Sequence, residues 1–346
     1  MSIKKVTVII PCYNVENYID RCLNSVVKQT IGLDAMEIIC VDDDSTDGTF
    51  FKLKQWKSEY PDHILVIKNK NNEKQGASRN KAFALAKGEY IGYVDSDDWI
   101  EPDMYERMYE KAKAYQCDIV HCEYKRDSGF DGNEDSLAKA ETNNQDKILY
   151  IENEIERKKF IVSACIGYYC MNKLINAEFL RENNIYFPEK LAYEDLFWGS
   201  LIYLYATRIY FINQVFYHYF TNPASTVLQK NVSYQFDILQ IMRLRIEEYK
   251  KRNVWDKFQS EIEFELLVSG YLSAVKIFFT RFTKVPFEKF YELQVMMRDC
   301  FPNASKNPYI TENLTQMQQL TISLIQSHLS VEELKDLKKI LNLKLE

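Results

Sequence analysis

A predicted β-strand runs directly into a group of carboxylates in the sequence YIGYVDSDDW, residues 90–99. The first five residues are mostly apolar or aromatic, which favours a strand. Asp95, Asp97 and Asp98 follow at the point where this strand would end. Ligands of open α/β sheets bind at the carboxyl ends of the strands, so the stretch predicts an acidic binding edge.

The same order of strand and helix fills the first 125 residues. Apolar runs predict strands at 6–10, 37–41, 64–67, 90–94 and 118–122. Helical spacing of apolar residues predicts helices at 14–29, 49–60, 77–86 and 102–115. Pro102 suits the first turn of the last of these helices. Strands that alternate with helices imply right-handed crossovers and a parallel sheet.

The rest of the chain does not continue this alternation. Residues 127–146 are polar and acidic, and we expect a surface loop or a disordered insertion there. Residues 147–222 show no clear period, and the remainder is helical in pattern, with amphipathic stretches at 234–251, 258–279 and 330–344. Ser330 and Glu333 fit a capping box at the start of the last helix.

Length and composition fit two globular domains. The chain has 346 residues, of which 46% are hydrophobic and only 10 are Gly and 8 are Pro, which excludes collagen-like and disordered classes. We place the boundary between residues 222 and 231, which gives domains at 1–225 and 232–346. The 44 basic and 50 acidic residues leave a net charge of -6, which argues against a general nucleic-acid binder.

The cysteine and hydrophobicity patterns predict a cytoplasmic protein with reduced thiols. Eight Cys occur without a Cys-x-x-Cys pair, and several lie in apolar runs, namely Cys12, Cys40, Cys117 and Cys165. We expect reduced core thiols, and four scattered His argue against a zinc site. The N-terminus lacks a signal-peptide pattern, and the longest apolar stretch, residues 160–171, is too short to span a bilayer.

A second acidic cluster follows the strand predicted at 37–41, in the sequence DDDSTDG of residues 42–48. Asp44, Ser45 or Asp47 would cap the next helix, but capping does not account for both clusters. Clustered carboxylates are tolerated around a hard cation such as Mg²⁺ or Mn²⁺, whose other ligands are usually substrate phosphates. Phosphates in turn imply a nucleotide.

Phosphate binding has to come from residues outside a glycine-rich loop. Neither Gly-x-Gly-x-x-Gly nor Gly-x-x-x-x-Gly-Lys occurs, which argues against dinucleotide cofactors and P-loop enzymes. Arg79 lies near the start of a predicted helix, where the helix dipole also favours anions. A surface salt bridge is the alternative use of Arg79.

Four ordered motifs resemble the family 2 glycosyltransferases with the GT-A fold. They are VIIPCYN (8–14), VDDDSTDG (41–48), GASRN (76–80) and GEYIGYVDSDDW (88–99). The resemblance implies an α/β fold with a Rossmann-like, mostly parallel central sheet flanked by helices, and an α-helical C-terminal extension. Asp44 departs from the family's usual glycine or small polar residue, which matters little if its carboxylate points to solvent.

The resemblance assigns nucleotide-sugar binding to residues 1–125. It implies that Pro11, Tyr13 and Asn14 line the nucleotide pocket. Asp43 would accept a hydrogen bond from the uracil N–H, and we expect it at an open strand end rather than in the core. Arg79 would hold the base or the diphosphate.

The Asp-x-Asp motif is the metal-binding part of the resemblance. Asp97 would ligate Mn²⁺ or Mg²⁺, and Asp95 would face the ribose or the metal-bound water. Ser96 lies between them in the nucleotide-sugar site. Asp98 would bind the metal or the donor sugar.

A second set of motifs resembles the acceptor region of bacterial cell-surface members of the family. These motifs are MNKLI (171–175), FPE (187–189) and YEDLFW (193–198), and they place the acceptor half at residues 147–225. The resemblance makes Asp195 the base that deprotonates the acceptor hydroxyl, with support from Glu194. Alternatively, both carboxylates stabilise the N-terminus of the following helix.

The sequence leaves two possible roles for each of three aromatic side chains. Trp99 and Trp198 would either stack on sugars or pack in the core. His218 resembles a position near the diphosphate in the family, and its alternative is a packed histidine in an aromatic run.

The resemblance implies a metal-dependent, inverting glycosyltransferase. It would move a sugar from a UDP-sugar to a hydroxyl of a surface polysaccharide, a teichoic-acid-like polymer, a glycolipid or a glycoprotein glycan. A sugar nucleotidyltransferase is one alternative, but that class usually has a glycine-rich loop after the first strand. A non-catalytic scaffold that binds nucleotide-sugars is the other.

The helical C-terminal region leaves three uses open. It would pack on the catalytic domain, form a homo-oligomer interface, or contact the inner face of the cell membrane. We expect four phenylalanines interspersed with basic residues to pack in the core with their Lys and Arg neighbours solvated; contact with an anionic membrane is the alternative. They are Phe278, Phe279, Phe282 and Phe287. We expect a homo-oligomer.

Overall fold

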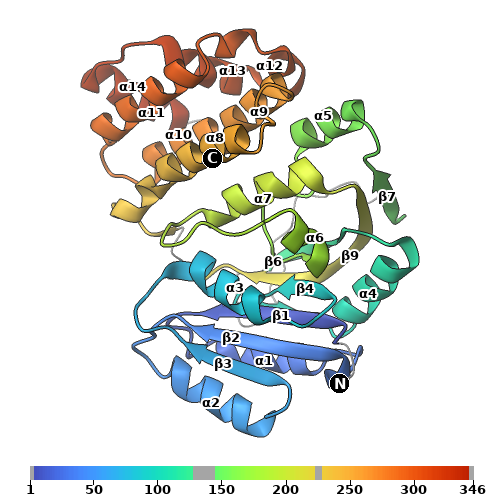
Figure 1. Ribbon diagram of the computed structural model, residues 1–346. Helices are drawn as coiled ribbons and strands as arrows, with labels where there is room; N and C mark the ends of the chain where they lie inside the picture. The colour runs from blue at the N-terminus through green and yellow to red at the C-terminus, as the bar shows by residue number, and fades with distance from the viewer. Residues whose placement is uncertain (1–3, 128–144, 223–227, 343–346) are drawn as a thin grey trace. The chain divides into compact units, whose positions relative to one another are not determined.

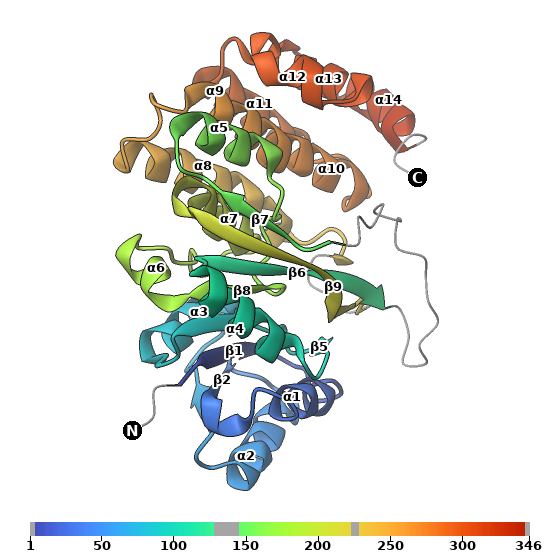
Figure 2. The ribbon, with the colours of Figure 1, turned by 90° about the vertical axis from the view of Figure 1, so that its right-hand side faces the viewer.

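The computed structural model describes residues 4–127, 145–222 and 228–342. The chain divides into two compact units, one of Met1–Glu156 with Ile166–Pro223 and one of Arg157–Cys165 with Ala224–Glu346. Figures 1 and 2 show the elements of each unit from two directions. Most of the insertion predicted at 127–146 lies outside the described residues.

A mixed β-sheet forms the centre of the first unit (Figure 1). The strand order is β3-β2-β1-β4-β8-β6-β9-β5, and β7 pairs with β9. The strands are β1 (Val6–Cys12), β2 (Met36–Asp42), β3 (Ile64–Lys68), β4 (Tyr90–Tyr93), β5 (Trp99–Ile100), β6 (Ile119–Asp127), β7 (Lys147–Tyr150), β8 (Lys173–Asn176) and β9 (Arg208–Phe220). The first four strands of the order, β3 to β4, are parallel neighbours, as the alternation of strands and helices predicts.

β8 makes the sheet mixed rather than parallel. It lies between β4 and β6 and is antiparallel to both. The strands predicted at 90–94 and 118–122 are therefore not direct neighbours. β8 has only four residues, which is too short for a periodic pattern to reveal.

Helices cover both faces of this sheet. α1 (Ile19–Val27), α2 (Thr49–Glu59) and α4 (Met104–Tyr115) share a core with alternate residues of β1, including Val6, Val8 and Ile10. α1 and α2 lie side by side in both views (Figures 1 and 2). α3 (Lys74–Leu85) connects β3 to β4 in the reverse direction along the sheet, so its right-handed crossover covers the other face. The unit also contains α6 (Ala177–Glu182) and α7 (Glu194–Tyr205), whereas most of α5 (Glu154–Ser163) belongs to the second unit.

Three predicted helix starts differ from the observed ones. The helix predicted at 14–29 begins at Ile19, because Asn14 adopts a left-handed φ of 51° that ends regular structure after β1. The helix predicted from Pro102 begins at Met104, and the Pro102 carbonyl instead accepts a hydrogen bond from the backbone N–H of Thr30. The helix predicted at 77–86 begins at Lys74.

The second unit is helical over its described residues. Its longer helices are α8 (Asp237–Lys251), α9 (Gln259–Glu265), the π-helical η4 (Leu266–Leu272), α10 (Ser273–Thr280), α11 (Phe287–Cys300), α12 (Pro308–Asn313), α13 (Gln316–Ser323) and α14 (Val331–Asn342). The predicted capping box of the last helix is confirmed, because Ser330 Oγ accepts from the N–H of Glu333 and Glu333 Oε2 accepts from the N–H of Ser330.

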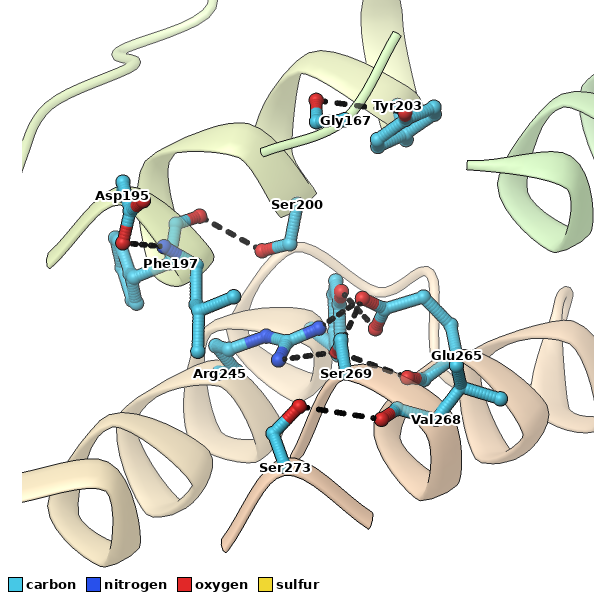
Figure 3. A network of polar contacts seen from close by, with 12 residues as sticks. Gly167, Asp195, Phe197, Ser200, Tyr203, Arg245, Glu265, Val268, Ser269 and Ser273 are labelled. Atoms are coloured by element: carbon cyan, nitrogen blue, oxygen red, sulfur yellow. Dashed lines mark hydrogen bonds and ion pairs between the residues drawn. The ribbon is translucent and has the colours of Figure 1, made fainter. Parts of the chain in front are cut away.

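A buried ion pair joins α8 to the helical segment that follows it (Figure 3). Arg245 is fully buried, pairs with Glu265 and donates to Ser269 Oγ at 2.9 Å. The hydroxyl of Tyr249 donates to the second oxygen of Glu265 at 3.1 Å. Removing one partner would leave a buried charge without compensation, so the network fixes the packing of these helices.

The buried side chains bear out core packing for two phenylalanines and correct the expectation for one cysteine. Phe278 and Phe279 are fully buried in the second unit, so neither is exposed for membrane contact. Cys165 is exposed rather than part of a core, although all eight cysteines are thiols without a disulfide partner, as predicted. Among the described helices, none is both long and apolar enough to cross a membrane.

Candidate active site

The predicted nucleotide-binding residues follow three neighbouring parallel strands. Pro11 lies near the end of β1, Asp43 follows β2, and Asp95 follows β4. Register pairs Pro11 with Val41 and Ile9 with Tyr93, so the three strand ends meet at one edge of the sheet. This edge is the ligand-binding edge of an open α/β sheet.

The loops after β1 and β2 are tied together. Asn14 Oδ1 accepts from the N–H of Thr46 at 2.9 Å, and the Asn14 N–H donates to Ser45 Oγ at 3.1 Å. Pro11 is buried, whereas Tyr13 is 48% exposed. Tyr13 is therefore accessible to a flat ligand, while Asn14 shapes the loop on which Tyr13 lies.

Asp43 is buried, which corrects the expectation of an open position. Its side chain is 3% exposed, and its Oδ1 accepts from Asn69 Nδ2 at 2.7 Å and from the Glu73 N–H at 2.9 Å. Because both contacts use Oδ1, no described residue is hydrogen-bonded to Oδ2. Asp43 thus holds the start of α3 with one oxygen and keeps the other as an acceptor.

Asp44 occupies a backbone conformation that explains the family's preference at this position. Its φ is 64°, in the left-handed region that glycine adopts most readily and that aspartate tolerates better than most residues. The side chain is half-exposed rather than fully solvated.

Arg79 joins the two acidic groups that the sequence places far apart. Its Nη2 donates to Asp95 Oδ1 at 2.8 Å, and its Nη1 donates to Glu194 Oε1 at 2.5 Å. The side chain is 3% exposed, so Arg79 is not a surface salt bridge. One buried guanidinium therefore compensates a carboxylate of the Asp-x-Asp motif and a carboxylate of the Glu-Asp pair.

The absence of a side chain at Gly76 permits this arrangement. A Cβ there would lie 2.3 Å from the carbonyl oxygen of Pro188 and 3.3 Å from Cγ of Glu194. The first turn of α3 is thus in close contact with the segment that carries the Glu-Asp pair. Any larger residue at position 76 would clash with the backbone of Pro188 in that segment.

Asp97 is held from two sides. Asn222 Nδ2 donates to its Oδ2 at 3.1 Å, and Arg21 Nη2 donates to its backbone carbonyl at 2.6 Å. Burial, together with the nearby charge of Asp95, raises the pKa of Asp97. Sequence reasoning missed Arg21 and Asn222, because each is distant in sequence and belongs to no motif.

Asp98 is engaged within the protein, which corrects the expectation that it binds the metal or the donor sugar. It is 1% exposed, and both oxygens have internal partners: Oδ2 accepts from the Tyr217 hydroxyl at 2.6 Å and Oδ1 accepts from the Phe220 N–H at 2.7 Å. The Tyr217 hydroxyl also accepts from the N–H of Asp95 at 3.0 Å. Asp98 and Tyr217 therefore hold the acidic loop in place through hydrogen bonds. Ser96 is buried within this loop.

Asp195 lies in the first turn of α7, next to Glu194. Its Oδ1 accepts from the N–H of Leu196 at 2.9 Å, a contact visible in Figure 3. Burial and the adjacent Glu194 charge raise the pKa of Asp195 to about 7. A carboxylate in that range combines substantial deprotonation with useful basicity near neutral pH.

The acidic residues fit a metal that is shared with a substrate. Among the described residues, no group of three or more His, Cys, Asp or Glu side chains is arranged to hold an ion alone. Asp95 and Asp97 remain as two neighbouring carboxylates, and burial together with the Asp95 charge outweighs the nearby Arg21 in raising the pKa of Asp97. Mg²⁺ is commonly bound by one or two carboxylates together with substrate phosphates, which matches this donor set.

The structure decides between the alternatives for three aromatic residues. Trp198 is 1% exposed and stacks on Phe187 with ring centroids 5.1 Å apart, so it is a core residue. Trp99 stacks on His218 at 4.9 Å, and the guanidinium of Arg21 lies 3.9 Å from the Trp99 ring centroid. His218 contacts Asp127 at 2.9 Å and Glu101 at 2.6 Å, so both of its ring nitrogens are engaged within the protein.

Comparison with known families settles the class of the chain. Residues 7–180, which include the strand ends described above, match the model of glycosyl transferase family 2. The chain belongs to this family. The family match and the mixed, helix-flanked sheet with a helical C-terminal region confirm the predicted fold class.

Individual relatives come from bacterial glycan synthesis. Poly(ribitol-phosphate) beta-glucosyltransferase of Bacillus spizizenii is 36% identical over 206 residues, which cover 59% of this chain and 30% of that protein. Putative glycosyltransferase EpsH of Bacillus subtilis is 27% identical over 303 residues, covering 86% of this chain and 85% of that protein. The chain thus spans less than a third of the first relative and most of the second.

A solved structure shares the fold. Residues 1–349 of TarS from S. aureus, in complex with UDP-GlcNAc, superpose with a TM-score of 0.69 at 23% identity, covering 87% of this chain and 83% of that chain. The similarity extends beyond the family-model match into the C-terminal part of the chain.

Proposed function

We propose that the protein is an inverting, metal-dependent glycosyltransferase that moves a sugar from a UDP-sugar to a hydroxyl of a glycan acceptor. The bridge from Asp95 through Arg79 to Glu194 carries this proposal. It brings a carboxylate suited to the donor side and a pair suited to the acceptor side into one site. The TarS complex with UDP-GlcNAc supports a UDP-sugar as the donor class.

The donor side consists of Tyr13, Asp43, Asp95 and Asp97. Tyr13 is exposed for stacking on the base, and Asp43 has an oxygen for the uracil N–H. A Mg²⁺ or Mn²⁺ ion held by Asp95, Asp97 and the donor phosphates would neutralise charge on the leaving diphosphate. Asp98 instead supports the loop, because both of its oxygens have internal partners.

The acceptor side consists of Asp195 and Glu194. Asp195 removes the proton of the acceptor hydroxyl, and the oxygen forms a bond to the anomeric carbon as the bond to the diphosphate breaks. UDP leaves with the electron pair of the broken bond, and the new glycosidic bond has inverted configuration. Glu194 holds Arg79 in place and raises the basicity of Asp195 through its charge.

The names of the relatives support a broad class of acceptor. Relatives named for poly(ribitol-phosphate) glucosylation and N-acetylglucosaminylation support a surface polymer as acceptor. We assign residues 1–125 to the donor, residues 147–225 to the acceptor, and residues 232–346 to a separate helical domain. Cytoplasmic location, homo-oligomerisation and membrane contact stay predictions.

Release of UDP tests this function. Purified protein is incubated with Mn²⁺ and, in turn, UDP-glucose, UDP-galactose, UDP-GlcNAc and UDP-GalNAc, and free UDP is measured. We expect release from at least one donor in the wild type, and its loss in Asp97→Ala. Binding of UDP without release from any donor would instead identify a scaffold, and release of pyrophosphate from a sugar phosphate and UTP would identify a nucleotidyltransferase.

A further inference from the structure

Three tyrosines form a row in the first unit. Tyr124 on β6 lies at the centre, with its ring centroid 6.2 Å from that of Tyr169 and 6.5 Å from that of Tyr219 on β9. Both ring pairs meet at steep angles, 73° and 65°, rather than as flat stacks. Tyr169 is 44% exposed, and the other two are half-buried. The row is therefore a partly exposed aromatic surface that can contact the carbons of a ligand.

The two ends of this row lie on segments that contact the two halves of the active site. Burial, followed by the charges of Tyr124 and Asp195, raises the pKa of Tyr169. Burial, followed by the charges of Asp95, Asp98 and Asp97, raises the pKa of Tyr219. Tyr219 lies on β9 just after Tyr217, whose hydroxyl donates to Asp98. Asn222 follows three positions later and donates to Asp97. Tyr169 follows Tyr168, whose backbone packs against Gly199 of α7.

The loop that carries Tyr169 is fixed on the helix that carries Asp195. The Ile166 N–H donates to the Tyr203 hydroxyl at 3.0 Å, and Figure 3 shows the Tyr203 hydroxyl against the Gly167 carbonyl. A Cβ at Gly199 of α7 would lie 2.7 Å from Cα of Tyr168, so loop and helix are in direct backbone contact. The loop that carries Tyr169 is therefore tightly packed on α7, the helix that begins with Glu194 and Asp195.

Arg126 adds a positive charge beside the row. It pairs in register with Tyr219, and its guanidinium carbon lies 5.9 Å from the Tyr219 ring centroid. The side chain is exposed, and no described carboxylate lies within 4.0 Å of it, in contrast to the paired Arg79. An exposed guanidinium without a carboxylate partner is suited to bidentate binding of a phosphate or carboxylate group.

We propose that Tyr124, Tyr169, Tyr219 and Arg126 form the acceptor subsite, and that it takes an anionic chain, with Arg126 on an acidic group of the acceptor. This inference rests on the proposed function, because the row is an acceptor site only if Asp195 is the base. The acidic edge at Asp95 and Asp97 repels an anionic chain, and Arg126 offsets that repulsion where the chain would enter. The tyrosines contact the sugar or polyol carbons between its charges.

Direct binding tests the subsite without requiring turnover. An oligo(ribitol phosphate) chain and a neutral glucan oligosaccharide of similar length are titrated into the full-length protein with UDP and Mn²⁺ at saturation, at two salt concentrations. We expect the wild type to bind the phosphate chain more tightly, with an advantage that shrinks at high salt. Arg126→Ala should weaken that binding about tenfold or more, and Arg126→Lys should restore part of it.

Two control variants separate the subsite from general surface effects. Lys125→Ala removes the neighbouring cation on the opposite side of β6, and Phe51→Ala removes an aromatic side chain that is 61% exposed on α2. Neither should change chain binding. Tyr169→Ala should weaken the phosphate chain and the neutral chain alike, because the ring contacts carbon rather than charge.

Three results would overturn the inference. They are equal or tighter binding of the neutral chain by the wild type, unchanged binding of the phosphate chain by Arg126→Ala, and weaker binding of UDP rather than of the chain in that variant. The last result would assign Arg126 to the donor diphosphate. The proposed function is tested separately: absence of UDP release would contradict it. The binding results would still show whether the subsite takes an anionic chain.

Discussion

Arg79 Nη1 lies 2.5 Å from Glu194 Oε1, although the two residues are 115 positions apart in the sequence. The same guanidinium contacts Asp95 at 2.8 Å through Nη2. Helix α3 thus carries the cation that holds the donor-side and acceptor-side carboxylates in one geometry. A change at Arg79 should therefore affect both halves of the site, and the stability of the fold as well.

Arg79→Ala should lower the free energy of unfolding by about 3–5 kcal/mol, because it leaves two carboxylates without their buried partner. The matched control is Lys52→Ala, which removes an ion pair with Asp20 whose side chains are 34% and 54% exposed. That change should cost at most about 1 kcal/mol. Urea unfolding of both variants measures the difference, and equal losses would show that the Arg79 pairs contribute no more than a surface contact.

Asp195→Asn should abolish transfer while leaving the donor site intact. The amide keeps the size of the side chain but cannot take up a proton, and loss of a general base typically costs about 10²–10⁴-fold in rate. Calorimetric titration with UDP should give the wild-type affinity. If UDP binding fell as much as transfer, Asp195 would belong to the donor site or to the fold instead.

The rate of transfer should rise with pH through an apparent pKa near 7. Burial and the Glu194 charge raise the pKa of Asp195 to about 7, and the base acts only when deprotonated, so activity is lost as the pH falls below that value. Glu194→Gln removes the neighbouring negative charge and should move the rising limb to lower pH. A kcat/KM profile from pH 5 to 9 for wild type and variant measures the shift, and an unmoved limb would separate Asp195 from the observed titration.

The sequence predicts a site residue where the residues next to it in the chain determine its position. Asp43 could be placed at a strand end because it follows the apolar run 37–41, and Asp95 and Asp97 because they follow the run 90–94. Asp97 and Asp98 look equivalent in the sequence, but the hydroxyl of Tyr217, 119 positions away, draws Asp98 inward. No local pattern contains that information, because it depends on how β9 pairs with β5 and β6.

The same reasoning explains the errors in the fold. The parallel part of the sheet follows from crossovers whose strands and helices are long enough to show a period. The antiparallel β8 is set by its pairing with β4 and β6, not by its own four residues. Arg79 could be placed near an anion from its position in a helix, but the identity of that anion required the contact with Glu194.

Asp97→Ala should reduce transfer by orders of magnitude, since a metal bound by this carboxylate supplies several kcal/mol of charge stabilisation in the transition state. Treatment of the wild type with EDTA should have the same effect, and added Mn²⁺ or Mg²⁺ should reverse only the second loss. Asn222→Ala should have a smaller effect than Asp97→Ala, because it removes the hydrogen bond to Asp97 Oδ2 but keeps the carboxylate. It should raise the metal concentration needed for half-maximal activity, whereas full activity of the wild type in EDTA would exclude a metal role.

Asp43→Asn should change which base the site prefers. Both protein donors, Asn69 Nδ2 and the Glu73 N–H, contact Oδ1 of Asp43, so the amide oxygen of the variant should stay on them. Its NH₂ group would then face the base in place of an acceptor. Uracil presents N3–H at that edge and would meet a donor, whereas cytosine presents an unprotonated N3 that accepts one.

The ratio of UDP to CDP affinity should therefore fall in Asp43→Asn, and CDP binding should strengthen in absolute terms, since a site that leaves a buried polar group unpaired penalises the wrong base. Titration calorimetry with both nucleotides on wild type and variant gives the four affinities. Asp43→Ala is the less informative variant, because it also releases the start of α3 and should lower stability. An unchanged UDP to CDP ratio in Asp43→Asn would show that the base is recognised by other residues.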